Sequence, residues 1–363
     1  MKDISFFLGA NTYRGFYSLY EEYLKSCKGD SVWILKGGAG CGKSSFMRTV
    51  GNCASAAGYP VRRILCSGDP SSLDGIHIPD LGIVMIDGTA PHVLEPPLVG
   101  DRGFYLDLSR FYRPGVPDLR EMEETYREHY RRAYCWLAAA GEAENSLRLP
   151  AETETVIRRR AAALIGRELR TKSRTPGKTR RVFTDAFTGE GMVSLPETKA
   201  VLVQRQIGIR GICGAEHVFL AAAADAAVSK GWDAVLAPSP LQPNKLAHLF
   251  VPENGLGIGV GEGDRYIHLD NLIYRMAGKE EAARIRDTES MRLALLTKGR
   301  KELALARFHH DRLEAAVNPY VDFAGVQEAA KAFAEKMLKT APSPAAETCS
   351  VSQSVALVSP GRT

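Results

Sequence analysis

The stretch that decides the fold reads SVWILKGGAGCGKSS and covers residues 31–45. Its first six residues are a short apolar run, which predicts a buried strand. The eight residues from Gly37 to Ser44 fit the pattern G-x-x-x-x-G-K-[ST] at every fixed position. A helical pattern then begins at Lys43 and stops at Gly58. A strand, a glycine-rich loop and a helix in this order predict a phosphate-binding loop.

The residue types in this loop suit a triphosphate. Glycines let the backbone turn tightly, so that successive N–H groups point inward at phosphate oxygens. The helix that follows adds the positive end of its dipole. We expect Lys43 to reach the β- and γ-phosphates and the Ser44 hydroxyl to bind Mg²⁺. The predicted nucleotide-contacting residues are Gly37, Gly38, Ala39, Gly40, Cys41, Gly42, Lys43, Ser44 and Ser45.

An acidic residue after a nearby apolar run is a candidate second ligand for Mg²⁺. Residues 81–86 read as a strand, and Asp87 follows them directly. We expect Asp87 to bind Mg²⁺ together with Ser44, and to act with Lys43 as a catalytic residue. The alternative is that Asp87 only starts a turn. Asp69, after the neighbouring predicted strand, is a further candidate, with an Asp-Pro turn as its alternative.

Other polar residues at the same predicted edge carry weaker signals. His77 and His92 fall in predicted loops, where each either positions a water or substrate or is an ordinary surface residue. Cys41 lies inside the loop, where oxidation would block binding; the alternative is a small filler side chain. The sequence selects no single charge-stabilising arginine among Arg48, Arg62 and Arg63.

Apolar runs continue at a spacing typical of an α/β sheet. Residues 61–66 read as a second strand, and residues 67–80, rich in Ser, Asp, Gly and Pro, read as a loop before the strand at 81–86. Amphipathic helical patterns follow at about 118–141 and 151–169. The pattern predicts an α/β fold of the P-loop NTPase class, a parallel sheet flanked by helices, with helical segments appended.

The second half of the chain repeats this order. Residues 199–203 resemble the strand at 32–35, and an alanine-rich helical stretch follows Gly214. We predict an internal duplication of about 170 residues, with chance similarity as the alternative. The predicted parts are a P-loop domain with appended helices at 1–176, a degenerate repeat with C-terminal helices, at about 279–313 and 325–338, within 177–339, and a disordered tail at 340–363.

The loop of the second half has lost its phosphate-binding residues. Ala215 stands at the lysine position and Glu216 at the hydroxyl position. A carboxylate there would repel phosphate at close range. We therefore expect only the first half to bind nucleotide.

The bulk composition is that of an ordinary soluble protein. The net charge is +5, and 45% of the residues are hydrophobic. The seven cysteines contain no C-x-x-C pair, which argues against a zinc site and a disulfide framework. No apolar run approaches the roughly 18 residues that span a bilayer. The predicted localisation is cytoplasmic, without a membrane partner.

A basic segment separates the two halves. Residues 156–181 hold ten arginines and lysines against one acid, Glu168. Such a cluster suits the phosphates of nucleic acid, but it lacks aromatic residues for base stacking. The alternative is a solvated helix face followed by a flexible basic linker.

The chain resembles a poorly characterised bacterial family of tandem P-loop ATPases and ATP-binding proteins. The resemblance rests on residues 37–45, on CSGDPSSLDG at 66–75 and on IDGTAPH at 86–92. It implies two nucleotide-binding repeats in series and ATP binding. The second loop departs from that pattern, which puts a second active site in doubt.

Several functions are compatible with these motifs. The leading prediction is a Mg²⁺-dependent ATPase that uses ATP, since the N-K-x-D guanine signal is missing and the nearest string is NKLA at 244–247. The first alternative is a small-molecule or nucleotide kinase with its acceptor near Asp69 and His92. The others are a non-catalytic ATP sensor and an ATPase coupled to nucleic acid. No protein partner is indicated.

Overall fold

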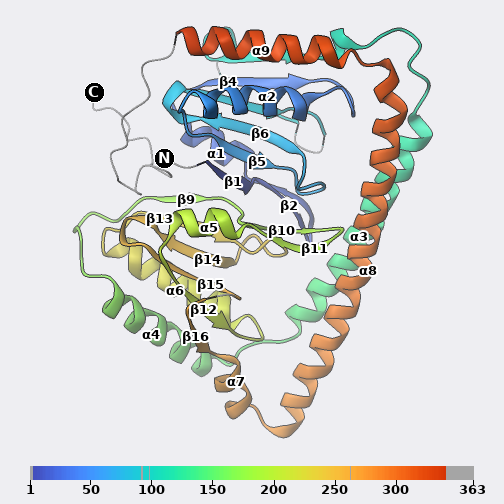
Figure 1. Cartoon of the computed structure of the whole chain (residues 1–363). Coiled ribbons are helices and arrows are strands. Elements are labelled where there is room, and N and C mark those ends of the chain that lie inside the picture. The colour runs from blue at the N-terminus through green and yellow to red at the C-terminus, as the bar shows by residue number, and fades with distance from the viewer. Residues whose placement is uncertain (1–2, 91–92, 98, 262, 341–363) are drawn as a thin grey trace.

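The computed structural model describes residues 3–90, 93–97, 99–261 and 263–340. It is a mixed α/β structure in which helices flank two six-stranded sheets (Figure 1). Residues 4–107 supply the first sheet and residues 179–268 the second. The predicted α/β class is confirmed. No described helix is both long enough and apolar enough to cross a membrane.

The first sheet has the strand order β1-β5-β6-β7-β4-β8. Its neighbouring strands are parallel, except that β6 runs antiparallel to β5 and β7. The bounds are Ile4–Phe7 (β1), Ser31–Lys36 (β4), Arg62–Leu65 (β5), Leu73–Ile78 (β6), Ile83–Asp87 (β7) and Gly103–Asp107 (β8). Because β4 lies between β7 and β8, the carboxyl ends of three parallel strands meet at one edge.

The second sheet repeats this arrangement strand for strand. Its order is β16-β12-β15-β14-β13-β9, and β14 is its antiparallel strand. The bounds are Thr179–Arg181 (β9), Arg205–Arg210 (β12), Ala234–Pro238 (β13), Leu246–Val251 (β14), Leu256–Val260 (β15) and Arg265–His268 (β16). The central strand β12 therefore occupies the place that β4 has in the first sheet.

A hairpin and a short helix follow the first strand of each sheet. The elements are β2 (Gly9–Thr12), β3 (Gly15–Ser18) and α1 (Tyr20–Ser26) in the first half, and β10 (Asp185–Thr188), β11 (Gly191–Ser194) and α5 (Pro196–Leu202) in the second. The two hairpin turns are closed in the same way. Thr12 Oγ1 donates to the Gly15 carbonyl, and Thr188 Oγ1 donates to the Gly191 carbonyl.

Two of the remaining helices are exchanged between the halves. The remaining helices are α2 (Lys43–Ala56), α3 (Arg120–Asn145), α4 (Ala151–Glu168), α6 (Ala215–Ser229), α7 (Asp270–Met276), α8 (Lys279–Val317) and α9 (Phe323–Lys339). α2 packs on the first sheet and α6 on the second. The C-terminal α9 covers α2, whereas α4 covers α6, and α3 runs beside α8 along one side of the molecule (Figure 1). Each half is therefore completed by a helix from the other.

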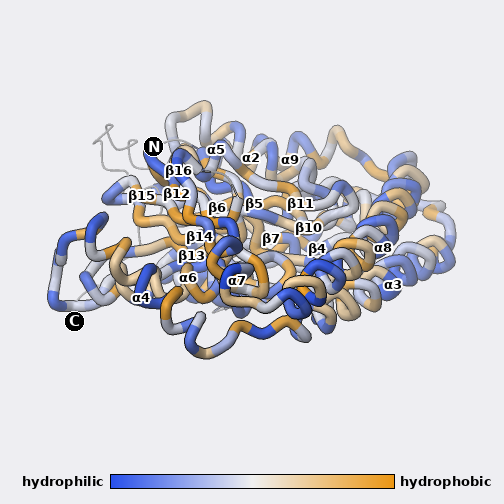
Figure 2. Tube along the Cα trace, turned by 90° about the horizontal axis from the view of Figure 1, so that it is seen from below, coloured by the Kyte–Doolittle hydropathy of each residue, from blue (hydrophilic) through white to orange (hydrophobic). Residues whose placement is uncertain are grey.

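The two halves also share a hydrophobic core. Phe7 and Phe183, which follow the same path in their halves, exchange backbone hydrogen bonds of 2.9 and 3.0 Å. Both rings are fully buried in one cluster that includes Val235 and Phe250. Hydrophobic residues gather along the central strands, while hydrophilic turns recur along α3 and α8 (Figure 2). The sheets are thus joined through buried apolar surface.

Two predicted elements are wrong. The predicted loop at 67–80 contains strand β6, whose six residues are all buried. The predicted strand at 199–203 is the end of helix α5, and the strand that matches β4 is β12. Turn-forming residues suggested a loop at 67–80, and apolar residues suggested a strand at 199–203. In both places packing in the folded chain gives a different element. The tail predicted from residue 340 lies outside the described residues except for Thr340.

Candidate functional site

The loop after β4 has the backbone conformation that its glycines allow. Gly37, Gly40 and Gly42 have φ angles of +143°, +71° and +89°, a region that other residues rarely adopt. A side chain at Gly40 would also lie 3.3 Å from the backbone of Glu314. Gly42 is the N-cap of α2, so the loop leads directly into the first turn of a 14-residue helix. Glycine is thus required at these three places.

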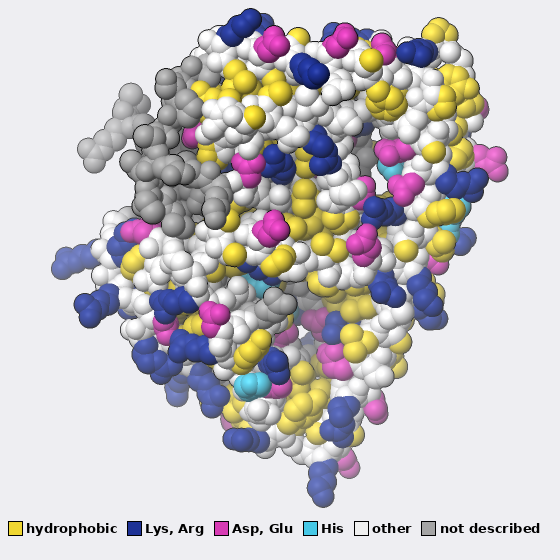
Figure 3. All heavy atoms as spheres, viewed as in Figure 1, with side chains coloured by type: hydrophobic (Ala, Val, Ile, Leu, Met, Phe, Trp, Pro, Cys, Tyr) yellow, Lys and Arg dark blue, Asp and Glu magenta, His cyan; other side chains and the backbone are white. Residues whose placement is uncertain are grey.

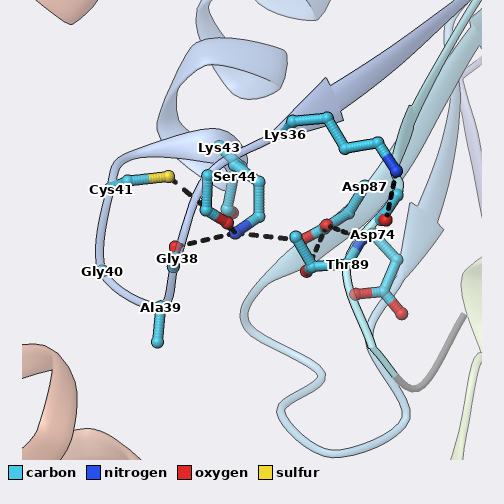
Figure 4. A network of polar contacts seen from close by, with 12 residues as sticks. Lys36, Gly38, Ala39, Gly40, Cys41, Lys43, Ser44, Asp74, Asp87 and Thr89 are labelled. Carbon is cyan, nitrogen blue, oxygen red and sulfur yellow. Dashed lines mark hydrogen bonds and ion pairs between the residues drawn. The ribbon is translucent and has the colours of Figure 1, made fainter. Parts of the chain in front are cut away.

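Lys43 reaches back over this loop. Its ammonium group donates to the carbonyls of Gly37 and Gly38 at 2.8 and 2.9 Å, and it lies 3.6 Å from Asp87 Oδ2 (Figure 4). The residue is only 8% exposed. The structure therefore brings the predicted lysine, the loop and the predicted carboxylate together at one edge of the sheet.

Ser44 ties the start of α2 to the sheet. Its Oγ accepts a hydrogen bond of 3.0 Å from the backbone N–H of Leu73, the first residue of β6. Ser45 is exposed on the same helical turn. Arg48, one turn further along α2, donates to the Ser71 carbonyl at 2.6 Å. Helix α2 and the loop before β6 are therefore tied together behind the loop at 37–42.

Asp87 forms the turn of one alternative, and its second carboxylate oxygen faces Lys43. β4 and β7 are adjacent and parallel, and Leu35 and Asp87 are partners in register. Asp87 Oδ1 accepts from the backbone N–H and the hydroxyl of Thr89 at 2.9 and 2.6 Å, which is a turn, while Oδ2 faces Lys43. The Ser44 hydroxyl and the Asp87 carboxylate are oxygen donors, the type that Mg²⁺ prefers, and so the residues present fit that ion.

Asp69 lies in the loop after β5, and its carboxylate already has partners within the chain. Its carboxylate accepts from the Ser71 hydroxyl at 2.7 Å and from the Ser71 N–H at 3.1 Å, so the turn alternative holds. Asp69 Oδ1 also pairs with Arg307 of α8 at 2.8 Å. Its carboxylate therefore anchors the long helix of the second half beside the site.

The second half supplies residues that the motifs did not indicate. Glu314 of α8 accepts a hydrogen bond of 3.2 Å from the Gly40 N–H, a backbone donor of the loop at 37–42. Val326 of α9 packs close to Gly42. From the first half, the Tyr112 hydroxyl donates to the Ala39 carbonyl at 3.4 Å. Glu314 is separated from Gly40 by 274 residues. The duplication was the one signal that could have pointed to it, because it predicts long helices at the end of each half.

The predictions for the two histidines have different outcomes. His77 is not a loop residue at the ligand edge; it lies in β6, in register with Val84 near the start of β7. Its side chain is buried, with Nδ1 2.7 Å from the Tyr23 hydroxyl and Nε2 3.1 Å from Asp30 Oδ2. Burial lowers the pKa of His77 to about 4 although Asp30 acts in the opposite direction. His92 lies outside the described residues.

The remaining candidates lie away from the loop at 37–42 or have an unreactive side chain. Arg62 is buried in β5 and Arg63 pairs with Asp3, so neither faces the loop. Cys41 is 1% exposed, its Sγ 3.8 Å from Lys43 Nζ. Burial raises the pKa of this thiol, which keeps it protonated. The filler alternative for Cys41 is therefore supported.

The loop of the second half is shorter as well as altered. Residues 211–214 connect β12 to α6, four residues where the first loop has six at 37–42. Cys213 has a φ of +57°, which is unfavourable for a residue with a side chain. The Glu216 carboxylate folds back against Gly211, where a Cβ would lie 2.4 Å from Oε2. A carboxylate thus fills the inner side of this loop.

No family model, curated protein or solved structure matches this chain. The resemblance to tandem P-loop ATPases therefore stays a prediction based on the motifs.

Proposed function

We propose that the chain binds a Mg²⁺-bound nucleoside triphosphate, preferentially ATP, at residues 37–45 and hydrolyses it. One observation carries the proposal. Three glycines in left-handed or extended positive-φ backbone precede Lys43 and Ser44 at a helix N-terminus, and Asp87 closes the adjacent parallel strand. The same α/β frame supports the P-loop NTPase class.

In this proposal each residue has a defined part. The loop N–H groups and Lys43 hold the phosphates, with Lys43 turning outward from the carbonyls of Gly37 and Gly38. Ser44 and Asp87 would hold Mg²⁺, which neutralises phosphate charge when bound. The water-orienting group is not assigned, since Asp69 is paired and His77 is remote.

We further propose that the two halves arose by duplication. Their sheets share one strand order, their hairpins share one threonine turn, and Phe7 meets Phe183 between them. The shortened second loop and Glu216 remove the phosphate site from the second copy. A single nucleotide per chain follows from this proposal.

A non-catalytic nucleotide sensor is the second candidate, and one observation favours it. α8 and α9 of the second half pack on the loop, through Glu314 at Gly40 and Val326 at Gly42. Nucleotide at the loop would therefore alter how these helices pack. Tight binding without phosphate release would support the sensor over the ATPase.

The test is calorimetry of the full chain with Mg²⁺-ATP and Mg²⁺-GTP, followed by a phosphate-release assay. We expect one ATP per chain, weaker GTP binding, and no measurable binding by Lys43→Ala. Lys245→Ala is the matched control, because Lys245 lies beside the second loop near Gly214. Unchanged affinity in Lys43→Ala would overturn the proposal, and two nucleotides per chain would overturn the loss of the second site.

A further inference from the structure

Helix α4 carries a row of basic side chains on its outer side. Its apolar residues Ile157, Ala161, Leu164 and Ile165 are buried and belong to the core of the second half. Figure 3 shows Lys and Arg side chains gathered at the lower left, where Figure 1 places α4. We define the α4 basic surface as the exposed residues Arg159, Arg160, Arg167, Arg170, Arg174 and Lys178.

Two acids of this region, Glu154 and Glu168, are ion-paired with cations outside the α4 basic surface. Glu154 pairs with Arg158. Glu168, the only acid among residues 156–181, pairs with both Arg205 and Arg265. Within the part of the chain that the structure describes, none of the six residues of the α4 basic surface has an ion pair. These six side chains therefore form a solvated basic face, as the alternative describes, and their charge is available to a partner.

Six unpaired cations at one surface attract a polyanion, and three features of this surface indicate which kind of polyanion it binds. Guanidinium groups match phosphate oxygens in geometry. A membrane-bound helix needs an exposed apolar face, and that face of α4 is buried against α6. Residues 156–181 contain no aromatic side chain on which unpaired bases could stack, and the ring of the neighbouring Trp232, whose indole N–H donates to the Arg170 carbonyl, is covered by Lys172. Duplex nucleic acid, bound through its backbone, offers phosphate oxygens to the guanidinium groups and needs neither an exposed apolar helix face nor base stacking.

We propose that the α4 basic surface binds the phosphate backbone of duplex nucleic acid without reading its sequence. Helix α4 rises about 1.5 Å per residue, so its arginines span roughly 12 Å between Arg159 and Arg167. The segment that follows continues the surface through Arg170, Arg174 and Lys178. The proposal does not depend on the proposed nucleotide site, which lies at the first sheet, whereas α4 packs beside the second sheet on α6.

The test measures binding of the full chain to fluorescein-labelled 20-base-pair duplexes of DNA and of RNA by anisotropy. The test variant is R159Q/R160Q/R167Q/R170Q. The control is R120Q/R127Q/R131Q/R132Q, which removes the same charge from exposed arginines of α3 that are all ion-paired. The two duplex arms distinguish DNA from RNA as the source of the phosphates.

Six phosphate contacts predict a slope of about −5 for log K against log salt. The test variant should lose between about three and four units of that slope and bind at least tenfold more weakly at ~50 mM salt, while the control keeps wild-type binding. R159Q/R160Q alone should lose about two units, which guards against a folding defect in the fourfold variant.

Three results would overturn the proposal. One is the absence of duplex binding at low salt. Another is an equal loss in the test variant and the control. The third is tighter binding to single strands or to phosphatidylserine vesicles than to either duplex. None of these results bears on ATP binding, so the two proposals fail independently.

Discussion

Lys43 and Glu314 form hydrogen bonds with backbone groups of opposite polarity in the same loop. The ammonium group takes the carbonyls of Gly37 and Gly38, and the carboxylate takes the N–H of Gly40. A triphosphate would compete with Glu314 for that N–H and be repelled by its charge. If the loop binds a triphosphate as proposed, Glu314 would oppose that binding, and helix α8 would have to shift or rotate this side chain.

Glu314→Gln should bind Mg²⁺-ATP more tightly than wild type, by about tenfold or ~1.4 kcal/mol, because it keeps the shape and removes the charge. Calorimetry of the full chain measures this. Glu280→Gln is the matched control, since it makes the same substitution at an exposed residue in the first turn of α8, at the opposite end of the helix from Glu314, and is expected to leave affinity unchanged. Equal or weaker binding in Glu314→Gln would contradict the role assigned to this carboxylate.

At the scale of elements, the loop that carries the candidate site could be predicted from local sequence, whereas the elements packed around it could not. The strand–loop–helix unit at 31–56 follows from an apolar run, glycines and a lysine, all close together in the chain. Strand β6 was missed because its sequence, LDGIHI, mixes turn residues with apolar ones. Gly75 permits a strand here because it lets the neighbouring strand β7 approach closely. A Cβ at this position would lie 2.8 Å from the Met85 carbonyl oxygen. Long-range contacts such as Glu314 with Gly40 leave no local trace.

Strand β6 also places a neutral histidine in the core, and this predicts a pH dependence of stability. The pKa of His77 is about 4 when folded, against about 6.5 in an unfolded chain. Between these values the unfolded chain binds more protons, so stability is full above pH 6.5 and is lost as the pH falls toward 4. The loss assigned to His77 is about 2 kcal/mol at pH 5.

Thermal unfolding of wild type and His77→Gln at pH 7.5 and pH 5.0 measures this loss. The groups around the imidazole are Tyr23, Asp30, Cys27 and Arg62. Burial also lowers the pKa of His248, so both proteins should lose stability at low pH, and wild type should lose more. An equal fall in the two midpoints would contradict a buried neutral His77.

At the scale of the whole molecule, exchange of helices makes each half incomplete. α4 belongs to the first half in sequence but covers α6, and α9 belongs to the second half but covers α2. A chain cut between the halves would leave the apolar side of α4 without its partner and would remove α9 from behind the loop. The predicted boundary at residue 176 is therefore a boundary of sequence, across which packing continues.

Fragment complementation tests this organisation. We expect residues 1–176 expressed alone to be poorly soluble, because the apolar face of α4 is exposed. We also expect them to bind no Mg²⁺-ATP, because α9 no longer packs against α2. Co-expression with residues 177–363 should restore binding to within about tenfold of the intact chain, since the shared core and the exchanged helices can reassemble without a covalent link. The same pair carrying Lys43→Ala is the control and should reassemble without binding. If residues 1–176 alone bind Mg²⁺-ATP as tightly as the whole chain, the exchanged helices do not support the site.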